Sequence, residues 1–250
     1  MAERAVIIHY HLFKNAGSSV DEILRHNFGD QWVEIEGPDN KKLTPDMMAD
    51  YIVKNPDIKV ISSHTAQITL PKIKGVKIIP IVFMRHPIAR IQSAYEFERN
   101  QESDQPGAKA AKDGDFKHYM AWRLSTAMMN QIVNFHTVRL KDFVKFTTNR
   151  EAHLFRQRAI QAVKQLPMVG LVEKFDESMA KYAELIRPYF PEFKVIAAHA
   201  NTRGAPKKSL QGKLKAFEEE IGRLSYINLV QLNAIDLDLY HFVQKNLWSE

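Results

Sequence analysis

Residues 11 to 19, HLFKNAGSS, place a lysine, a glycine and two serines directly behind an apolar segment that ends at Tyr10. We interpret Arg4 to Tyr10 as a strand and Gly17 to His26 as a helix, so this stretch joins the two elements. Backbone N–H groups at the start of a helix are unpaired and partly positive, and a glycine there lets an anion approach the backbone. With the charge of Lys14 added, the stretch is suited to phosphate binding.

The same residues have a plainer interpretation. Ser19 and Glu22 have the S-x-x-E spacing of a capping box, in which the serine only caps the helix. The stretch also differs from the nucleotide P-loop, G-x-x-x-x-G-K-[ST], because Lys14 precedes Gly17 instead of following a second glycine. These residues alone do not decide between a helix cap and a phosphate-binding loop. They do weaken the case for an ATP or GTP site.

A second candidate site lies in residues 83 to 100, FMRHPIARIQSAYEFERN. Arg85 follows the apolar run Lys77 to Met84, which is typical of a buried parallel strand, and Pro87 opens the next helix. Ser93 lies two turns into that helix, so a guanidinium and a hydroxyl are placed to hold one phosphate. A salt bridge or carbonyl contact of Arg85 is the structural alternative. We expect two further arginines of the helix to be solvated, Arg90 and Arg99.

His64 follows a third predicted strand, Ile58 to Ser62. Imidazole titrates near neutral pH, so a histidine beyond the carboxyl end of a strand is a candidate general base, and a structural histidine is the alternative. The remaining histidines form no convincing ligand set, so we predict no metal site. His9 and His11 flank the end of the first strand, and four others fall in predicted helices: His118, His136, His153 and His241.

Strand patterns alternate with helix patterns along the rest of the chain. This alternation predicts an α/β fold with a mostly parallel central sheet flanked by helices, in a single domain that spans residues 1–250. Ligands of such sheets lie beyond the carboxyl ends of the strands, where Lys14, His64 and Arg85 would meet. We further predict helices at about 116–136, 150–165 and 176–187, strands at 168–172 and 193–198, polar loops at 100–115, a candidate lid, and at 199–208, and a helical C-terminus.

The composition narrows the possible partners. A formal net charge of +6 in 250 residues favours anionic partners, but the basic residues are scattered without interleaved aromatics, which argues against nucleic acid. The chain has no cysteine, which excludes disulfides, thiolate metal sites and cysteine nucleophiles. We find no apolar run of transmembrane length and no secretory signal, and therefore expect a cytoplasmic location.

Taken in order, H-L-F-K-N-A-G-S-S and R-H-P-I-A-R-I-Q-S-A-Y resemble two motifs of the sulfotransferases that use 3′-phosphoadenosine 5′-phosphosulfate (PAPS). The likeness is to the branch that contains heparan sulfate 2-O- and other carbohydrate sulfotransferases and their bacterial relatives. There the motifs commonly read H-I-P-K-T-G-G-[TS]-S and R-D-P-x-x-R-x-x-S-x-Y. Residues 169–178 and 233–240 are similar to a late strand-to-helix segment and to the C-terminal helix of the family.

The resemblance implies a P-loop-like sulfotransferase fold that moves a sulfuryl group from PAPS to an acceptor hydroxyl without a metal. We expect the acceptor to be a glycan, with a phenol, a lipid and a peptide tyrosine as the alternatives. The 3′-phosphate would be held by Arg85 and Ser93, and Arg203 in the loop Asn201–Arg203 would be a further contact. His64 matches the second histidine of an H-G-H segment that supplies the base, with Ser62 in place of the first. The 5′-phosphosulfate would be held by Lys14, Asn15, Ala16, Gly17, Ser18 and Ser19, with Lys14 stabilising the leaving phosphate.

The sequence departs from the family pattern at three positions. Phe13 stands where proline is usual and Asn15 where threonine or alanine is usual, which affects the shape of the turn. His86 replaces a common aspartate, which puts the electrostatics around Arg85 in doubt. His11 matches a position that we interpret as structural. Asn130 and Gln131, predicted in an apolar helix, resemble a family feature near the cofactor or acceptor cleft, with a buried, satisfied amide as the alternative.

Two other functions compete with this interpretation. A nucleotide kinase or other phosphotransferase on a related sheet is opposed by the missing G-K-[ST] and by the lack of an evident magnesium carboxylate at a strand end. The third possibility is a non-catalytic protein of the same fold that binds anions or glycans.

Overall fold

A computed structural model describes residues 4–143, 152–198 and 209–248 of the chain. Its centre is a five-stranded sheet in the order β2-β3-β1-β4-β5, in which every paired strand is parallel to its neighbour. The strands are β1 (Arg4–Tyr10), β2 (Trp32–Glu34), β3 (Val60–Ser63), β4 (Val76–Met84) and β5 (Gly170–Leu171). The predicted α/β class with a mostly parallel sheet is confirmed.

The middle of the sheet is its most buried part. Ile7 of β1 pairs with Val60 on one side and Ile79 on the other, and Val6, Ile7 and Ile8 are fully buried. A strand covered on both faces has to be apolar in successive positions, which explains the unbroken runs in β1 and β4. Because both runs end at the same edge, the polar residues that follow them are brought together there.

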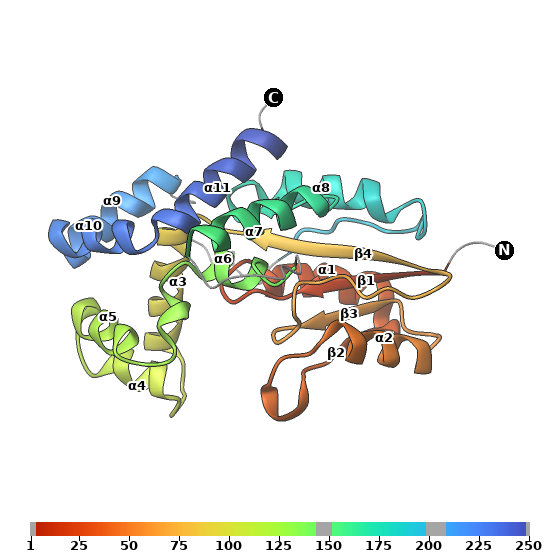
Figure 1. Ribbon diagram of the computed structural model, residues 1–250, viewed down its shortest axis with the longest axis horizontal. Helices are drawn as coiled ribbons and strands as arrows, with labels where there is room; N and C mark the ends of the chain where they lie inside the picture. The colour runs from red at the N-terminus through yellow and green to blue at the C-terminus, as the bar shows by residue number, and fades with distance from the viewer. Residues whose placement is uncertain (1–3, 144–151, 199–208, 249–250) are drawn as a thin grey trace.

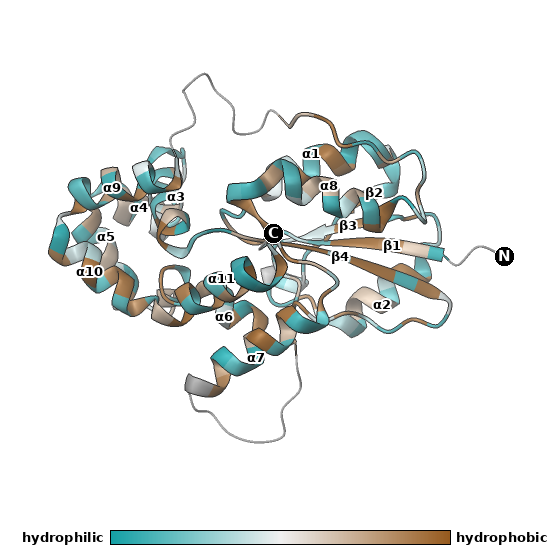
Figure 2. Ribbon diagram, turned by 90° about the horizontal axis from the view of Figure 1, so that it is seen from above, coloured by the Kyte–Doolittle hydropathy of each residue, from teal (hydrophilic) through white to brown (hydrophobic). Residues whose placement is uncertain are grey.

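Helices cover both faces of the sheet. Figure 2, in which the strands are strongly apolar, shows α1 and α8 along one face and α2, α6 and α7 along the other. The bounds of these and of the C-terminal helix are α1 (Gly17–Phe28), α2 (Pro45–Lys54), α6 (Phe135–Leu140), α7 (Ala152–Gln165), α8 (Phe175–Ile186) and α11 (Ala234–Leu247). α11 packs against α6 and α7.

A second group of helices lies beyond the carboxyl ends of the strands (Figure 1). It consists of α3 (Pro87–Asn100), α4 (Pro106–Lys112), α5 (Phe116–Leu124), α9 (Leu210–Ile221) and α10 (Arg223–Leu232). These helices enclose their own apolar cluster, which includes Tyr95, Phe116 and Phe217. α3 begins directly after β4 and packs in this cluster, so its first turns lie beside the ends of the strands.

An ion pair is buried within this helical group. Arg123 of α5 donates to both carboxylate oxygens of Glu98 in α3, and the hydroxyl of Tyr119 donates to the same carboxylate at 2.6 Å. The side chain of Arg123 is only 1% exposed. A charge in this position depends on its partner, since neither group has water to replace it.

Most predicted elements are present, with shifted ends. The strands before Lys14, His64 and Arg85, the helices after the first and third of these residues, and the helix at 150–165 are confirmed within a few residues. The strand at 168–172 is reduced to Gly170–Leu171, and the helix at 116–136 is divided into α5, a 3₁₀ turn at Met129–Gln131 and α6. Asn130 and Gln131 therefore lie in a turn and not in an apolar helix.

Two predictions were wrong. The segment 100–115 is not simply a loop, because α4 forms within it and fully buries Ala108 and Ala111, whose small side chains let the helix approach its neighbours. The segment 193–198 is not a strand. Its backbone at Lys194 exchanges two hydrogen bonds with the Asn27 side chain, of 2.8 and 2.9 Å, in place of a neighbouring strand. Residues 199–208, including Asn201–Arg203, lie outside the described residues.

Within the described ranges, no helix has both the length and the apolar character needed to cross a bilayer.

We expect the variant Glu98→Gln to lower the free energy of unfolding by about 3 kcal/mol, because Arg123 would be left as a buried charge without its carboxylate. Denaturant unfolding followed by circular dichroism measures this loss. Glu102→Gln is the matched control, since Glu102 is exposed just beyond the end of the same helix. Equal stability of the two variants would contradict a buried ion pair.

Candidate active site

The loop between β1 and α1 has an unusual backbone. Lys14 and Ala16 both adopt left-handed conformations, with φ of 61° and 62°, and α1 begins at the next residue, Gly17. Ala16 is the N-cap and has no side chain able to cap the helix, so the first N–H groups of α1 stay available to an anion. Ser19 is a buried residue inside the first turn, not the N-cap, so the capping-box interpretation was wrong.

Gly17 is required by a close approach and not by its backbone conformation. A Cβ atom at this position would lie 2.1 Å from Cδ2 and 2.2 Å from Nε2 of His11. The imidazole ring of His11 therefore occupies the space in which any other residue would place its side chain. The loop and the end of β1 are packed directly on one another at this point.

A buried carboxylate holds His11 in place. Nδ1 of His9 donates to Asp21 at 2.7 Å, and Nδ1 of His11 donates to the other oxygen of the same carboxylate at 2.8 Å. Burial alone would raise the pKa of Asp21, but the hydrogen bonds from His11 and His9 outweigh it and hold that pKa far below its usual range. The hydroxyl of Ser62 lies 3.0 Å from the same nitrogen of His9.

His64 lies against the exposed side of this network. Its ring stacks on the ring of His11 with the centroids 3.9 Å apart, and its side chain is 45% exposed. Nδ1 of His64 donates to Glu36 at 2.9 Å, and the backbone N–H of His64 donates to the same oxygen at 2.8 Å. Because Nδ1 carries the proton that is hydrogen-bonded to the carboxylate, Nε2 has a lone pair that can accept a proton from a ligand.

Glu36 is itself tightly held. Its second oxygen accepts hydrogen bonds from the backbone and the hydroxyl of Thr65 and, at 3.1 Å, from the hydroxyl of Ser63. Burial alone would raise the pKa of Glu36, but these bonds and those from His64 lower it overall. The carboxylate is therefore ionised at neutral pH and fixed in position beside the imidazole.

On the α3 side of the loop, Lys14 and Ser93 line a cavity of about 290 Å³ together with Phe97. The ammonium of Lys14 lies 4.3 Å from the centroid of the Phe97 ring, and Arg85 donates to the carbonyl of Lys14 at 3.4 Å. The pKa of Lys14 is lowered by burial and then by the charge of Arg85. Burial also lowers the pKa of Arg85. The charge of Glu96 opposes this lowering at both residues without reversing it, so the two neighbouring cations favour an additional anionic ligand.

On the other side of the loop, Asn15 is anchored to α6 and α11. Its amide nitrogen donates to the carbonyl of Phe13 at 2.9 Å, and its amide oxygen accepts from Nε2 of His136 at 2.9 Å. Nδ1 of His136 donates in turn to the buried carboxylate of Asp236 at 3.0 Å. The departure at Asn15 therefore keeps the turn defined by tying it to a distant helix.

The first 243 residues of the chain match a model of the sulfotransferase family. The chain belongs to this family. An uncharacterized protein from Archaeoglobus fulgidus is 40% identical over 250 residues, which cover 96% of each chain. These similarities confirm the resemblance at the level of the family and, with it, sulfuryl transfer as the general activity. The narrower likeness to the heparan sulfate 2-O branch stays a prediction.

In this sulfotransferase, the predicted site residues lie around one loop. Lys14, Arg85 and Ser93 are on the α3 side, and His64 is behind the loop on the β3 side. Their roles stay predictions, and Arg203 lies outside the described residues.

Sequence reasoning missed the groups that support these residues. Glu36, Asp21 and the pair His136–Asp236 contact site residues from separate elements. Glu36 follows β2, a strand of only three residues, which is too short to give a period-2 signal. Asp21 lies one helical turn after Gly17. Its position on α1, among apolar residues that face the sheet, is the signal that could have identified it as a buried charge beside β1.

The structure also shows the surroundings of Arg90, Arg99 and His86, and only Arg90 contradicts a prediction. Arg90 is buried and not solvated; it donates to the carbonyl of Gln131 and lies 4.2 Å from the centroid of the Phe135 ring. Arg99 is exposed, as predicted. At His86, burial first and then the charges of His241, His136 and Arg85 lower the pKa to about 4. This residue therefore adds neither positive nor negative charge beside Arg85 at neutral pH.

Among the described residues, two groups bring three possible metal ligands within 4.8 Å of one another. They are His9, His11 and Asp21, and Glu34, Glu36 and His64. In the first group the histidine Nδ1 atoms donate to the carboxylate, and in the second His64 donates to Glu36. Hydrogen bonds within each group thus account for the geometry.

We expect Gly17→Ala to destabilise the protein by about 2 kcal/mol, because the added methyl group overlaps the His11 ring. In the background of His11→Ala the same substitution should be neutral or stabilising, since the space is vacant and alanine is the better helix former. A double-mutant cycle of unfolding free energies measures the coupling. Additive effects would show that the His11 ring does not occupy this space in solution.

Proposed function

We propose that this sulfotransferase moves the sulfuryl group of PAPS to a hydroxyl of a carbohydrate acceptor. The observation that carries the proposal is the division of the site by one loop. Lys14 and Ser93 line a cavity on one side of the loop, where Arg85 donates to the carbonyl of Lys14. His64, whose Nε2 is free, stands on the other side. Such an arrangement suits a donor with two phosphate groups on the α3 side and an acceptor hydroxyl on the β3 side.

The donor side is supported by charge. PAPS differs from ATP in carrying a 3′-phosphate, and Arg85 with Ser93 offers this group a guanidinium and a hydroxyl. Lys14 and the first N–H groups of α1 offer positive charge to the 5′-phosphosulfate. The charge of Arg85 lowers the pKa of Lys14, so pairing both cations with an anionic ligand is the source of the affinity we expect.

The chemical step needs a base and a cation. The acceptor oxygen attacks sulfur, the bond between sulfur and the bridging phosphate oxygen breaks, and the electron pair of that bond stays on the phosphate. Nε2 of His64 takes the proton of the hydroxyl, while Lys14 stabilises the charge that grows on the leaving phosphate. Sulfuryl transfer by these residues requires no metal ion, and positioning and electrostatics supply most of the catalysis.

Binding of the donor product separates this proposal from a phosphotransferase. We expect adenosine 3′,5′-bisphosphate (PAP) to bind more tightly than ATP in the absence of magnesium, as measured by calorimetry. Ser93→Ala and Arg85→Gln should weaken PAP binding while changing adenosine 5′-monophosphate binding little, because only PAP has the 3′-phosphate. Tighter binding of ATP than of PAP would favour a phosphotransferase. So would variants that lose equal affinity for PAP and for adenosine 5′-monophosphate.

Turnover separates the proposal from a non-catalytic binding protein. Incubation with labelled PAPS and a panel of glycans, lipids and small alcohols, followed by mass spectrometry, identifies the acceptor. With that acceptor, we expect Lys14→Ala and His64→Ala to lower kcat by about a hundredfold or more while the proteins stay folded. Full activity of His64→Ala would remove this residue from the role of base.

We infer that Glu36 positions His64. Glu36→Gln should lower kcat roughly tenfold with little change in KM, because the amide no longer fixes the orientation and tautomer of the imidazole. Glu34→Gln is the control, since Glu34 lies 3.9 Å from the same imidazole nitrogen and has no hydrogen bond to it. An equal loss of kcat in both variants, a loss in neither, or a change confined to KM would contradict a positioning role for Glu36.

A further inference from the structure

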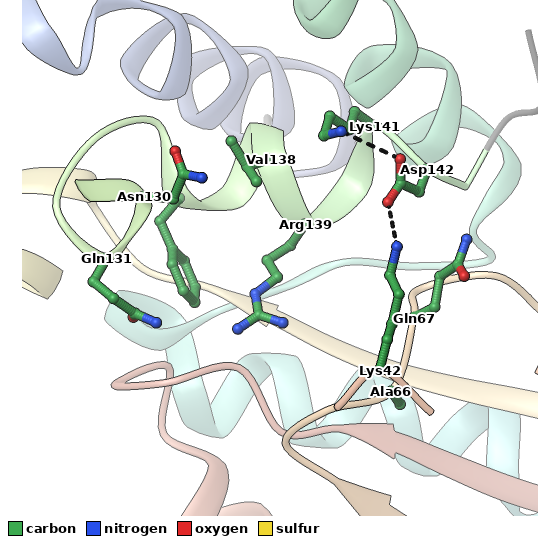
Figure 3. A pocket seen from close by; sticks show the side chains of 10 residues that line it. Lys42, Ala66, Gln67, Asn130, Gln131, Val138, Arg139, Lys141 and Asp142 are labelled. Atoms are coloured by element: carbon green, nitrogen blue, oxygen red, sulfur yellow. Dashed lines mark hydrogen bonds and ion pairs between the residues drawn. The ribbon is translucent and has the colours of Figure 1, made fainter. Parts of the chain in front are cut away.

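A second cavity opens on the β3 side of the loop. Its volume is about 280 Å³, and its walls come from the segment after His64, from the loop before α2 and from the turn and helix at residues 129–142 (Figure 3). The backbone of Leu43 bonds to both Thr65 and Gln67, so Lys42 and Gln67 form one wall directly beyond His64. Part of the cavity wall therefore follows the candidate base closely in sequence.

The charge inside this cavity is not balanced. Figure 3 shows the guanidinium of Arg139 extending from α6 into the middle of the cavity. Within the part of the chain that the structure describes, Arg139 makes no ion pair, and the only contact of its charge is with the Phe135 ring, 5.3 Å away. Burial lowers the pKa of Arg139, and no carboxylate opposes this effect. A partly buried guanidinium that lacks a carboxylate partner is a binding group for an anion.

The remaining charges of the cavity do not neutralise Arg139. Lys42 lies 2.6 Å and Lys141 3.4 Å from the two carboxylate oxygens of Asp142, so one carboxylate is shared by two lysines. The cavity thus contains three cations and one anion. A neutral acceptor would leave this excess positive charge unpaired.

Amide groups complete the lining. Gln67, Asn130 and Gln131 line the same cavity, and the side chain of Gln131 points toward the guanidinium of Arg139 in Figure 3. Oε1 of Gln131 is buried and has no hydrogen-bond partner, whereas the backbone carbonyl of Gln131 accepts from Arg90. An unpaired buried acceptor favours a ligand that brings a hydroxyl donor. Cations and amides together suit a polyhydroxylated ligand that also has an acidic group.

We propose that this cavity binds an anionic group of the acceptor, a carboxylate or a sulfate on a saccharide, with Arg139 as its main contact. The proposal rests on the proposed function, because it assigns the acceptor side of that site. Arg139 and Lys42 would select acidic saccharides over neutral ones and would hold the neighbouring hydroxyl near His64. The excess positive charge becomes paired only when the acceptor is bound.

The test measures binding with the donor side filled. Calorimetry in saturating PAP compares three oligosaccharides of similar length: oligogalacturonate for carboxylate, sulfated dextran oligosaccharide for sulfate, and a neutral dextran oligosaccharide. We expect at least one acidic ligand to bind, and the neutral one to bind about tenfold more weakly or not at all. Which acidic ligand binds more tightly identifies the anionic group.

The variants assign the binding to this cavity. Arg139→Gln should weaken binding of the acidic ligand by about tenfold or more, and Arg139→Lys should weaken it less. Asp142→Asn should strengthen it severalfold, because Lys42 and Lys141 are released from their shared carboxylate. Lys215→Gln is the control for lost charge, since Lys215 is exposed on α9 with only a 4.0 Å contact to Glu219.

Several results would overturn the proposal. They are binding of neither acidic oligosaccharide, equal binding of the neutral one, equal effects of Arg139→Gln and Lys215→Gln, or no gain in Asp142→Asn. Binding of PAP is measured separately for each variant. A loss of PAP binding in Arg139→Gln that matches the loss of saccharide binding would assign this arginine to the donor and also overturn the proposal. Failure of wild-type protein to bind PAP would instead count against the proposed function.

Discussion

The carboxylate of Asp21 is the interaction on which the site depends. It is buried between α1 and the end of β1, and it accepts a hydrogen bond from His9 and another from His11. A single buried carboxylate without these donors would be costly to ionise, and two buried imidazoles without the carboxylate would have unpaired N–H groups. The three groups therefore stabilise one another and fix the orientation of His11.

From His11 the constraint extends to the loop and to the candidate base. The ring lies so close to Gly17 that the start of α1 packs directly on the end of β1, with no space for a side chain between them. The same ring stacks on the ring of His64, which is also held by its hydrogen bond to Glu36. His11 was expected to be structural, and its contacts agree. The two residues that it contacts, Gly17 and His64, are however both used in the proposed chemistry.

The parallel sheet and the strand ends could be predicted because their signal is local. Each long buried strand has an unbroken apolar run, and the polar residues at its end are adjacent in sequence, as in Met84 followed by Arg85. The supporting residues were not predictable in the same way. Glu36 meets His64 across 28 positions, and Asn15 meets His136 across 121 positions, so neither contact leaves a periodic pattern. Arg90 was expected in solvent because α3 was judged as an isolated helix, whereas packing from α6 buries it.

The distribution of charge links stability to function. Buried Arg123 has its carboxylate, and the energy of that pair supports the fold alone. Lys14, Arg85 and Arg139 are also withdrawn from water, but burial lowers their pKa values without full compensation from acidic neighbours. Such groups make the unliganded protein less stable than it could be, and binding of the proposed anionic ligands would recover this cost. Because Lys14 and Arg139 line separate cavities, two anionic ligands would be brought to the two sides of one loop, with His64 on the side of the second cavity. The same imbalance that weakens the empty site would then orient donor and acceptor for transfer.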